Sequence, residues 1–230
     1  MSQPTSQLSS AAWRTAWLWI AAAAALGLAT SACFAGVLHV SRPLIVVAYA
    51  GLWGPFLVAY FGGTGVEVRR AVRRNLAWGV IGAAVAGVVV VNHVASQPAS
   101  PAPHGARLAL DLLWLGLVYG ALDALLLSVL PVVAVWQGTS ALGLTRSLEG
   151  RLLAGAAALA ASLLVTAAYH FGYPEFRGPQ LLGPLIGNAT LTVAFLLTRN
   201  PIAAIAPHVA MHMAAVLHGA AWAVQLPPHY

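Results

Sequence analysis

Two histidines, His208 and His212, lie four residues apart in an apolar segment near the end of the chain, PHVAMHMAAVLH. On a helix this spacing places both imidazoles on one face, with Cβ atoms about 5–6 Å apart. Two neutral imidazoles in this arrangement can chelate one divalent cation or polarise one water molecule. The glutamate of the HExxH motif is absent, so the pair alone is also compatible with two histidines that hydrogen-bond to neighbouring helices. His218 lies roughly 80° from His208 around a 3.6-residue helix, and we expect it to lie outside the pair.

Asp123 lies well inside another apolar segment, GLVYGALDALLLSVLP. A charged side chain at the centre of a membrane span costs about 2.5–3.5 kcal/mol on insertion scales, so it requires a partner or a function. Gly116 and Gly120 precede Asp123 by seven and three positions, which places all three residues on one helix face. Small residues four apart are typical of close helix–helix contacts. We therefore expect Asp123 to point into a helix bundle, either as a functional carboxylate or as a buried group in an interhelical hydrogen bond.

Two further polar residues interrupt apolar segments: His170 in LLVTAAYHFGYPEF, and Asn188 in the segment that follows. The chain thus distributes one carboxylate, three imidazoles and one amide over four consecutive segments. We expect Asp123, His170, His208 and His212 to converge on one cavity. Histidines with one carboxylate can bind a metal, activate a water molecule and stabilise an oxyanion.

The composition indicates an integral membrane protein. Of the 230 residues, 60% are hydrophobic and only 7% are charged, against about 25% charged residues in soluble domains. The mean hydropathy is +0.82. The net charge of +6 does not indicate nucleic-acid binding, because the arginines are spread over loops without a basic face interleaved with aromatic residues. A single cysteine, Cys33, excludes an intrachain disulfide.

Seven apolar stretches approach the roughly 20 residues that a helix needs to span hydrocarbon. The sequence therefore predicts an all-α fold, a polytopic transmembrane helix bundle of about seven spans, in one integral membrane domain over 1–230. The fourth stretch is long enough to tilt, to kink at Pro131 or to extend out of the membrane. His93 and Asp111 lie near the ends of their stretches, where we expect solvent to reach them. The predicted spans are 13–36, 43–62, 76–95, 108–136, 152–173, 180–198 and 201–223.

The arginines predict the orientation, because cytoplasmic loops of membrane proteins carry an excess of basic residues. Arg69, Arg70, Arg73 and Arg74 cluster between the second and third stretches. Placing this loop inside puts eight arginines on the cytoplasmic side and three outside. We expect a protein of the plasma membrane with a cytoplasmic N-terminus, an external C-terminus and membrane lipid as a partner.

The segments YHFGYPEF and GPLIGNATLTVAFLLTRNPIAAIAPHVAMH combine four features. A histidine closes one span, a glycine-containing span follows, a polar turn TRNP comes next, and a pair of polar residues lies four apart on the last helix. In these features the last third of the chain resembles the CPBP family of intramembrane proteases, which includes the type II CAAX prenyl endopeptidases and bacteriocin-processing relatives. The resemblance covers a core of roughly 105–220.

The resemblance implies an intramembrane metal-dependent endopeptidase that cleaves peptide bonds of membrane-associated peptides or proteins. It implies His170 and His208 as the histidines of the second and third motifs, and His212 stands where the family usually has Asn or Asp. A divalent metal, with zinc expected, would be bound by His170, His208 and His212. The family's first motif is EExxxR, whose glutamate activates the hydrolytic water; the aligned segment ALDALLLSVL offers only Asp123 and has no arginine.

Two other functions remain open from the sequence. The missing second carboxylate and arginine are compatible with a catalytically inactive relative that uses the same fold to bind or scaffold a membrane partner. A haem-binding or proton-relay protein is the third alternative, since a b-type haem needs two histidines on different helices, such as His170 and His208.

The orientation is testable by labelling single cysteines in a Cys33→Ala background. A membrane-impermeant thiol reagent applied to intact cells should label Ser100→Cys and should leave Val68→Cys unlabelled until the cells are opened. Labelling of Val68→Cys from outside would contradict the predicted topology.

Overall fold

The computed structural model describes residues 4–219 and 225–226, and every regular element in this part of the chain is helical. The first half consists of α1 (Pro4–Thr30), its π-helical continuation η1 (Ser31–Val37), α2 (Arg42–Gly63), the short α3 (Val68–Arg73) and α4 (Leu76–Ala95). A fourth span follows, made of α5 (Gly105–Asp111), η2 (Leu112–Val118), α6 (Tyr119–Ala124), η3 (Leu125–Val129) and α7 (Leu130–Ala141). The second half comprises η4 (Leu144–Arg146), α8 (Leu148–Phe171), η5 (Pro174–Phe176), η6 (Pro179–Leu181), α9 (Leu182–Thr198) and α10 (Ile202–His218).

Six helical segments of the described chain are long and apolar enough to cross a membrane, and α10 is a shorter apolar helix. The predicted all-α bundle of about seven spans is therefore confirmed. The last predicted span, 201–223, also included residues 220–223, which lie outside the described part.

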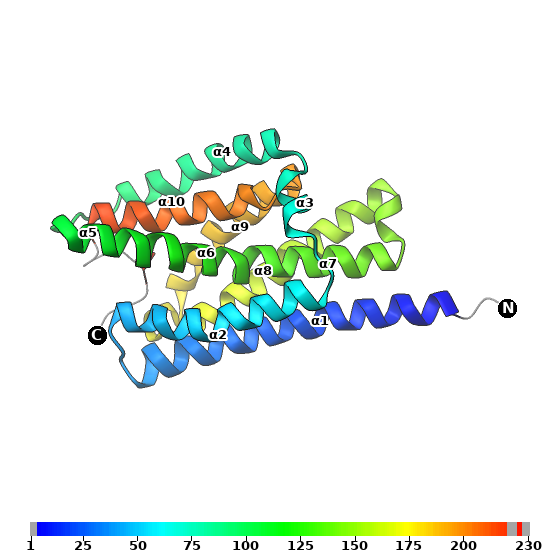
Figure 1. Ribbon diagram of the computed structural model, residues 1–230, viewed down its shortest axis with the longest axis horizontal. Coiled ribbons are helices and arrows are strands. Elements are labelled where there is room, and N and C mark those ends of the chain that lie inside the picture. The colour runs from blue at the N-terminus through cyan, green and yellow to red at the C-terminus, as the bar shows by residue number, and fades with distance from the viewer. Residues whose placement is uncertain (1–3, 220–224, 227–230) are drawn as a thin grey trace.

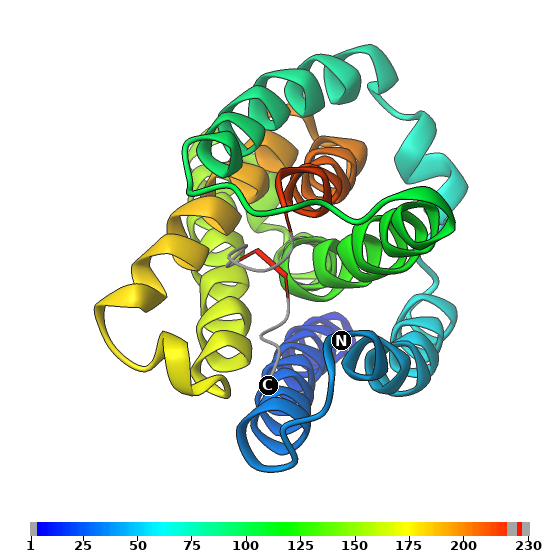
Figure 2. The ribbon, with the colours of Figure 1, turned by 90° about the vertical axis from the view of Figure 1, so that its left-hand side faces the viewer.

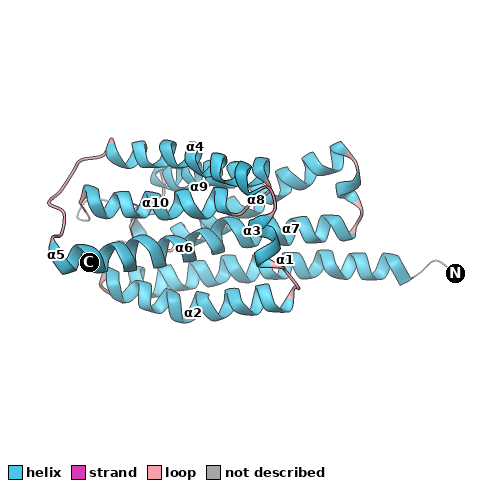
Figure 3. Cartoon of the chain, turned by 45° about the horizontal axis from the view of Figure 1, so that its top comes forward, coloured by secondary structure: helices cyan, strands magenta, loops and turns pink. Residues whose placement is uncertain are grey.

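The long helices run side by side, and the short α3 crosses them at one end (Figure 1). Viewed along the bundle, α10 lies inside, with α4, α9 and the fourth span around it (Figure 2). Helix α1 packs against α7 and α8, with α2 beside it. The connections alternate between the two ends, so α3, the α7–α8 connection and the α9–α10 turn share the end at which the chain begins (Figure 3).

The fourth span continues through Pro131 as one helical segment of 37 residues. Two π-helical stretches, η2 and η3, flank α6 in this span. Pro131 has no N–H to donate to the carbonyl of Leu127. The hydroxyl of Ser162 on α8 donates to that carbonyl instead, at 2.6 Å, and so satisfies a buried acceptor at the break in the hydrogen-bond ladder.

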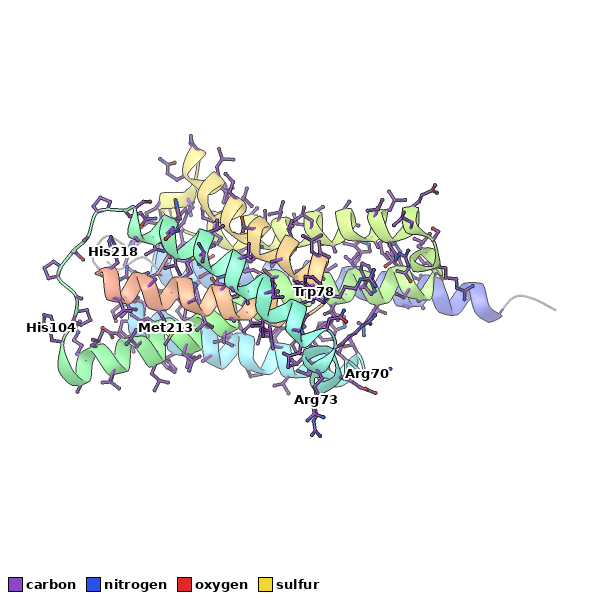
Figure 4. The ribbon with its side chains drawn as sticks, turned by 90° about the horizontal axis from the view of Figure 1, so that it is seen from above. Arg70, Arg73, Trp78, His104, Met213 and His218 are labelled. Carbon is purple, nitrogen blue, oxygen red and sulfur yellow. The ribbon has the colours of Figure 1, made fainter. Side chains whose placement is uncertain are left out.

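Gly116 and Gly120 allow the fourth span to approach α10 closely. A Cβ atom on Gly120 would lie 3.0 Å from His212 Cδ2 and 3.0 Å from Val209 Cα, and one on Gly116 would lie 2.8 Å from Met213 Cγ. Figure 4 shows Met213 on the side of α10 that lies next to the fourth span. The predicted close contact at the glycine face is therefore confirmed.

We expect Gly120→Leu to lower the stability of the bundle by about 1–3 kcal/mol, because the added side chain must push α6 away from the backbone of α10. Gly155→Leu on α8 is the matched control, since no atom lies within 4 Å of a Cβ at that position. Thermal unfolding of both variants in detergent, followed by circular dichroism, measures the difference. Equal unfolding temperatures for the two variants would contradict the close contact.

Candidate metal centre

Asp123 on α6 faces two histidines of α10 inside the bundle. Its Oδ2 atom lies 3.3 Å from His208 Nε2 and 3.6 Å from His212 Nε2. Asp123 and His208 are each 3% exposed, and His212 is 1% exposed. The two imidazole rings stack with centroids 5.1 Å apart, as expected for neighbours four residues apart on one helix. Asp123 thus points into the bundle as the glycine face predicted.

Several polar atoms of this group are buried without a hydrogen-bond partner in the described part of the chain. They are Asp123 Oδ1, His208 Nδ1 and the ring nitrogens of His212, although the His212 ring also lies near the backbone of Gln225. A buried polar atom without a partner costs about 1–3 kcal/mol, so four in one place indicate that the group is organised for a ligand. One ligand atom from each of the three residues can be chosen so that all lie within 4.8 Å of one another. Asp123, His208 and His212 can therefore hold a metal ion, with the carboxylate and imidazole ligands that divalent transition metals bind.

A cavity of about 550 Å³ opens beside this group. Its walls come from α4, α8, α9, α10 and the fourth span, and most of the lining side chains are apolar. All four residues predicted to converge, Asp123, His170, His208 and His212, line it. His93 on α4 lines it too and is exposed, as its place near a helix end predicted.

His170 lines the cavity but is hydrogen-bonded to the backbone of its own helix. Its Nδ1 atom lies 2.9 Å from the backbone carbonyl of Thr166, and a carbonyl oxygen only accepts, so the ring proton is on Nδ1. In the neutral ring, Nε2 is then a hydrogen-bond acceptor with a free lone pair. His170 is not among the three residues whose ligand atoms lie within 4.8 Å of one another.

The amide of Asn188 joins three helices at the wall of the cavity. Its Nδ2 donates to Thr166 Oγ1 at 2.7 Å and to Ser162 Oγ at 2.9 Å, and its Oδ1 accepts from Ser128 Oγ at 2.6 Å. Asn188 was expected from the sequence, whereas its hydroxyl partners were not. The spacing was available as a signal, because Ser162, Thr166 and His170 follow one another at intervals of four and so share one face of α8.

A chain of four tyrosine hydroxyls lies behind the metal-binding group and was not predicted. Tyr119 bonds Tyr169 at 2.6 Å, Tyr169 bonds Tyr173 at 2.6 Å, and Tyr173 bonds Tyr49 at 2.5 Å. The ring of Tyr119 also lies 4.7 Å from that of His212, between centroids. This chain connects α2, the fourth span and α8, and its Tyr119 ring packs next to the His212 ring.

His218 and Asp111, which also interrupted the apolar segments, have partners outside the group of Asp123, His208 and His212. His218 Nε2 lies 2.7 Å from the carbonyl of Gln97, so it lies outside the pair, as its angular position predicted. Figure 4 shows it at the end of α10, near the connection that also carries His104. Asp111 lies 3.8 Å from Arg107, one turn away on the same helix.

Searches of protein-family models, of characterised proteins and of solved structures give no match to this chain.

Proposed function

We propose that the chain is an intramembrane metal-dependent endopeptidase, with a zinc site formed by Asp123, His208 and His212. The observation that supports it is the group of three buried ligands with unpartnered polar atoms beside a cavity in the bundle. Three protein ligands of nitrogen and oxygen type are typical of catalytic zinc sites, which keep a fourth position for water or substrate. The likeness of the motifs around His170 and His208 to the CPBP proteases supports the same reaction class.

The motifs implied Asp123 as the base and His170 as a metal ligand, and the distances favour the reverse assignment. Asp123 Oδ2 lies between the Nε2 atoms of His208 and His212, which suits a third ligand better than a separate base. His170 keeps an acceptor nitrogen because its other nitrogen donates to Thr166. We therefore assign the general base to His170 and the metal ligands to the other three.

In the proposed reaction, a water molecule attacks the carbonyl carbon of the scissile peptide bond in the cavity. His170 Nε2 accepts the proton of the water as the new C–O bond forms, and returns it to the peptide nitrogen as the C–N bond breaks. A zinc ion bound at the three ligands would lower the pKa of water and polarise the carbonyl. The apolar walls suit a membrane-associated substrate, either a prenylated peptide or a transmembrane segment.

A catalytically inactive binding protein is the second candidate, and one observation favours it. The positions next to Asp123 are Leu122, which packs on the core, and Ala124, which is fully buried, so no second carboxylate accompanies Asp123. The haem alternative has less support, since the Nε2 atoms of both α10 histidines lie next to the Asp123 carboxylate, at 3.3 and 3.6 Å.

Cleavage of prenylated and transmembrane peptides by the purified protein, with and without chelator, tests the proposal. We expect His208→Ala, His170→Ala and Asp123→Asn each to lower the rate at least about 100-fold, because each removes a ligand or the base. Asp123→Glu keeps the carboxylate and should retain activity. His104→Gln, in the exposed 96–104 connection, is the control and should behave as the native protein.

No cleavage by either the native protein or Asp123→Glu would reject the protease proposal and leave the binding protein. Cleavage that persists in chelator and in His208→Ala would reject the metal site as the catalytic centre.

A further inference from the structure

A second cavity, of about 440 Å³, lies at the end of the bundle where α3 crosses the long helices. It shares no lining residue with the cavity beside Asp123. Its walls come from the end of α2, from α3, from η3 and α7, and from the α9–α10 turn region. The lining is apolar except for four polar or charged residues, Arg74, Gln137, Ser140 and Arg199.

Helix α3 covers this cavity with an amphipathic face. Three residues of α3 line the cavity: Val68, and Ala71 and Val72, which follow it by three and four positions and so share its helix face. Arg70 and Arg73 are exposed on the other side of the helix, and Figure 4 shows them pointing away from the bundle. A short helix with an apolar face inward and arginines outward is typical of a segment that lies in the interface of a membrane.

Hydrogen bonds join the α3–α4 connection, which carries Arg74, to the α9–α10 turn, which carries Arg199, at the edge of the cavity. The fully buried Asn200 donates from Nδ2 to the carbonyl of Val72 at 2.8 Å and to that of Arg74 at 2.7 Å. Asn75 Nδ2 donates back to the carbonyl of Thr198 at 3.3 Å. The Arg199 guanidinium lies 5.7 Å from the centre of the Trp136 ring. The backbone at Arg74 and the turn that carries Arg199 are thus joined by hydrogen bonds, and both arginines are exposed at the edge of one cavity.

The charge around this cavity is strongly positive. Five arginines lie on α3 and on the two fastened connections: Arg69, Arg70, Arg73, Arg74 and Arg199. The nearest acidic residue along the chain, Glu67, lies 3.7 Å from Arg70 and offsets only one of them. A second copy of this chain, presenting the same arginines, would be repelled from this surface.

We propose that this cavity binds one anionic phospholipid, with an acyl chain in the apolar cavity and the phosphate at Arg74 and Arg199. The guanidinium group suits a phosphate because its planar set of donors can bond two oxygens at once. The apolar walls require a ligand with a hydrocarbon chain, and the arginines require an anion, so a phospholipid such as phosphatidylglycerol fits both. The inference does not depend on the proposed protease activity.

Native mass spectrometry of the purified full chain, loaded with phosphatidylglycerol or with phosphatidylcholine of the same acyl chains, tests the site. We expect phosphatidylglycerol to be retained preferentially as one adduct. The Arg74→Gln/Arg199→Gln double variant should bind it about 25-fold more weakly, since each arginine near a membrane surface contributes about a fivefold effect. Ala71→Phe, which fills the cavity without changing charge, should weaken binding at least about tenfold. Arg146→Gln/Arg151→Gln, at the same end of the bundle and outside the cavity lining, is the control and should bind as the native protein.

Equal retention of the two lipids, or native affinity in both cavity variants, would overturn the proposal. Displacement of the lipid by inorganic phosphate at equal concentration would show that the acyl chain contributes nothing. A lipid-free dimer that Ala71→Phe dissociates would show that a second copy occupies the cavity instead. Size-exclusion profiles and helical content verify that each variant is folded, and phosphatidylglycerol-dependent thermal stabilisation of the native protein gives a readout that needs no variant.

Discussion

A carboxylate held between two imidazoles inside an apolar bundle is the interaction on which the rest of the structure depends. A single charge in hydrocarbon is costly, and a carboxylate is tolerated there when partners or a cation share its charge. Asp123 meets this condition with His208 and His212, at 3.3 and 3.6 Å. This contact requires α6 and α10 to lie very close together. It also requires α10 to lie inside the bundle, where α4, α9 and the fourth span surround it.

The glycines of the fourth span are the sequence feature that makes this approach possible. With a side chain at Gly120, the backbone of α10 could not lie where it does, and the imidazole of His212 would be displaced. The network around Asn188 and the tyrosine chain then fix the neighbouring helices through short hydrogen bonds between buried groups. Such fully connected polar networks stabilise one arrangement of a bundle, because every alternative leaves buried donors or acceptors without partners.

The sequence predicted the helices and the contact of Asp123 with the α10 histidines because both depend on local spacing, whereas the group that could hold a metal contains Asp123 in place of the expected His170. The seven apolar stretches coincide with the helical spans, since length and hydropathy decide which segments can cross hydrocarbon. The glycine spacing before Asp123 and the four-residue spacing of the histidines correctly placed three side chains at one helix contact. His93 is exposed near its helix end, as expected, and its place at the wall of the cavity could not be predicted because its sequence position does not show which helices face it.

What the sequence did not reveal depends on contacts between distant segments. The tyrosine chain joins residues up to 124 positions apart, and no periodicity along the chain predicts which hydroxyls will meet. The hydrogen bonds from Asn200 to the carbonyls of Val72 and Arg74 also join segments that lie far apart in the chain, so no local spacing predicts them. Tyr119 and Tyr173 line the cavity beside Asp123, and Val72 and Arg74 line the second cavity, so both cavities lie where such long-range contacts bring distant segments together.

X-ray absorption at the zinc edge of the zinc-loaded protein tests most directly whether Asp123, His208 and His212 form one metal site. The account predicts a first shell of nitrogen and oxygen ligands at about 2.0–2.2 Å, with outer-shell scattering from two imidazoles. His212→Ala should remove one imidazole from that signal, and His104→Gln should leave the spectrum unchanged. A zinc spectrum that is identical in the native protein and in a variant lacking all three side chains would contradict the account.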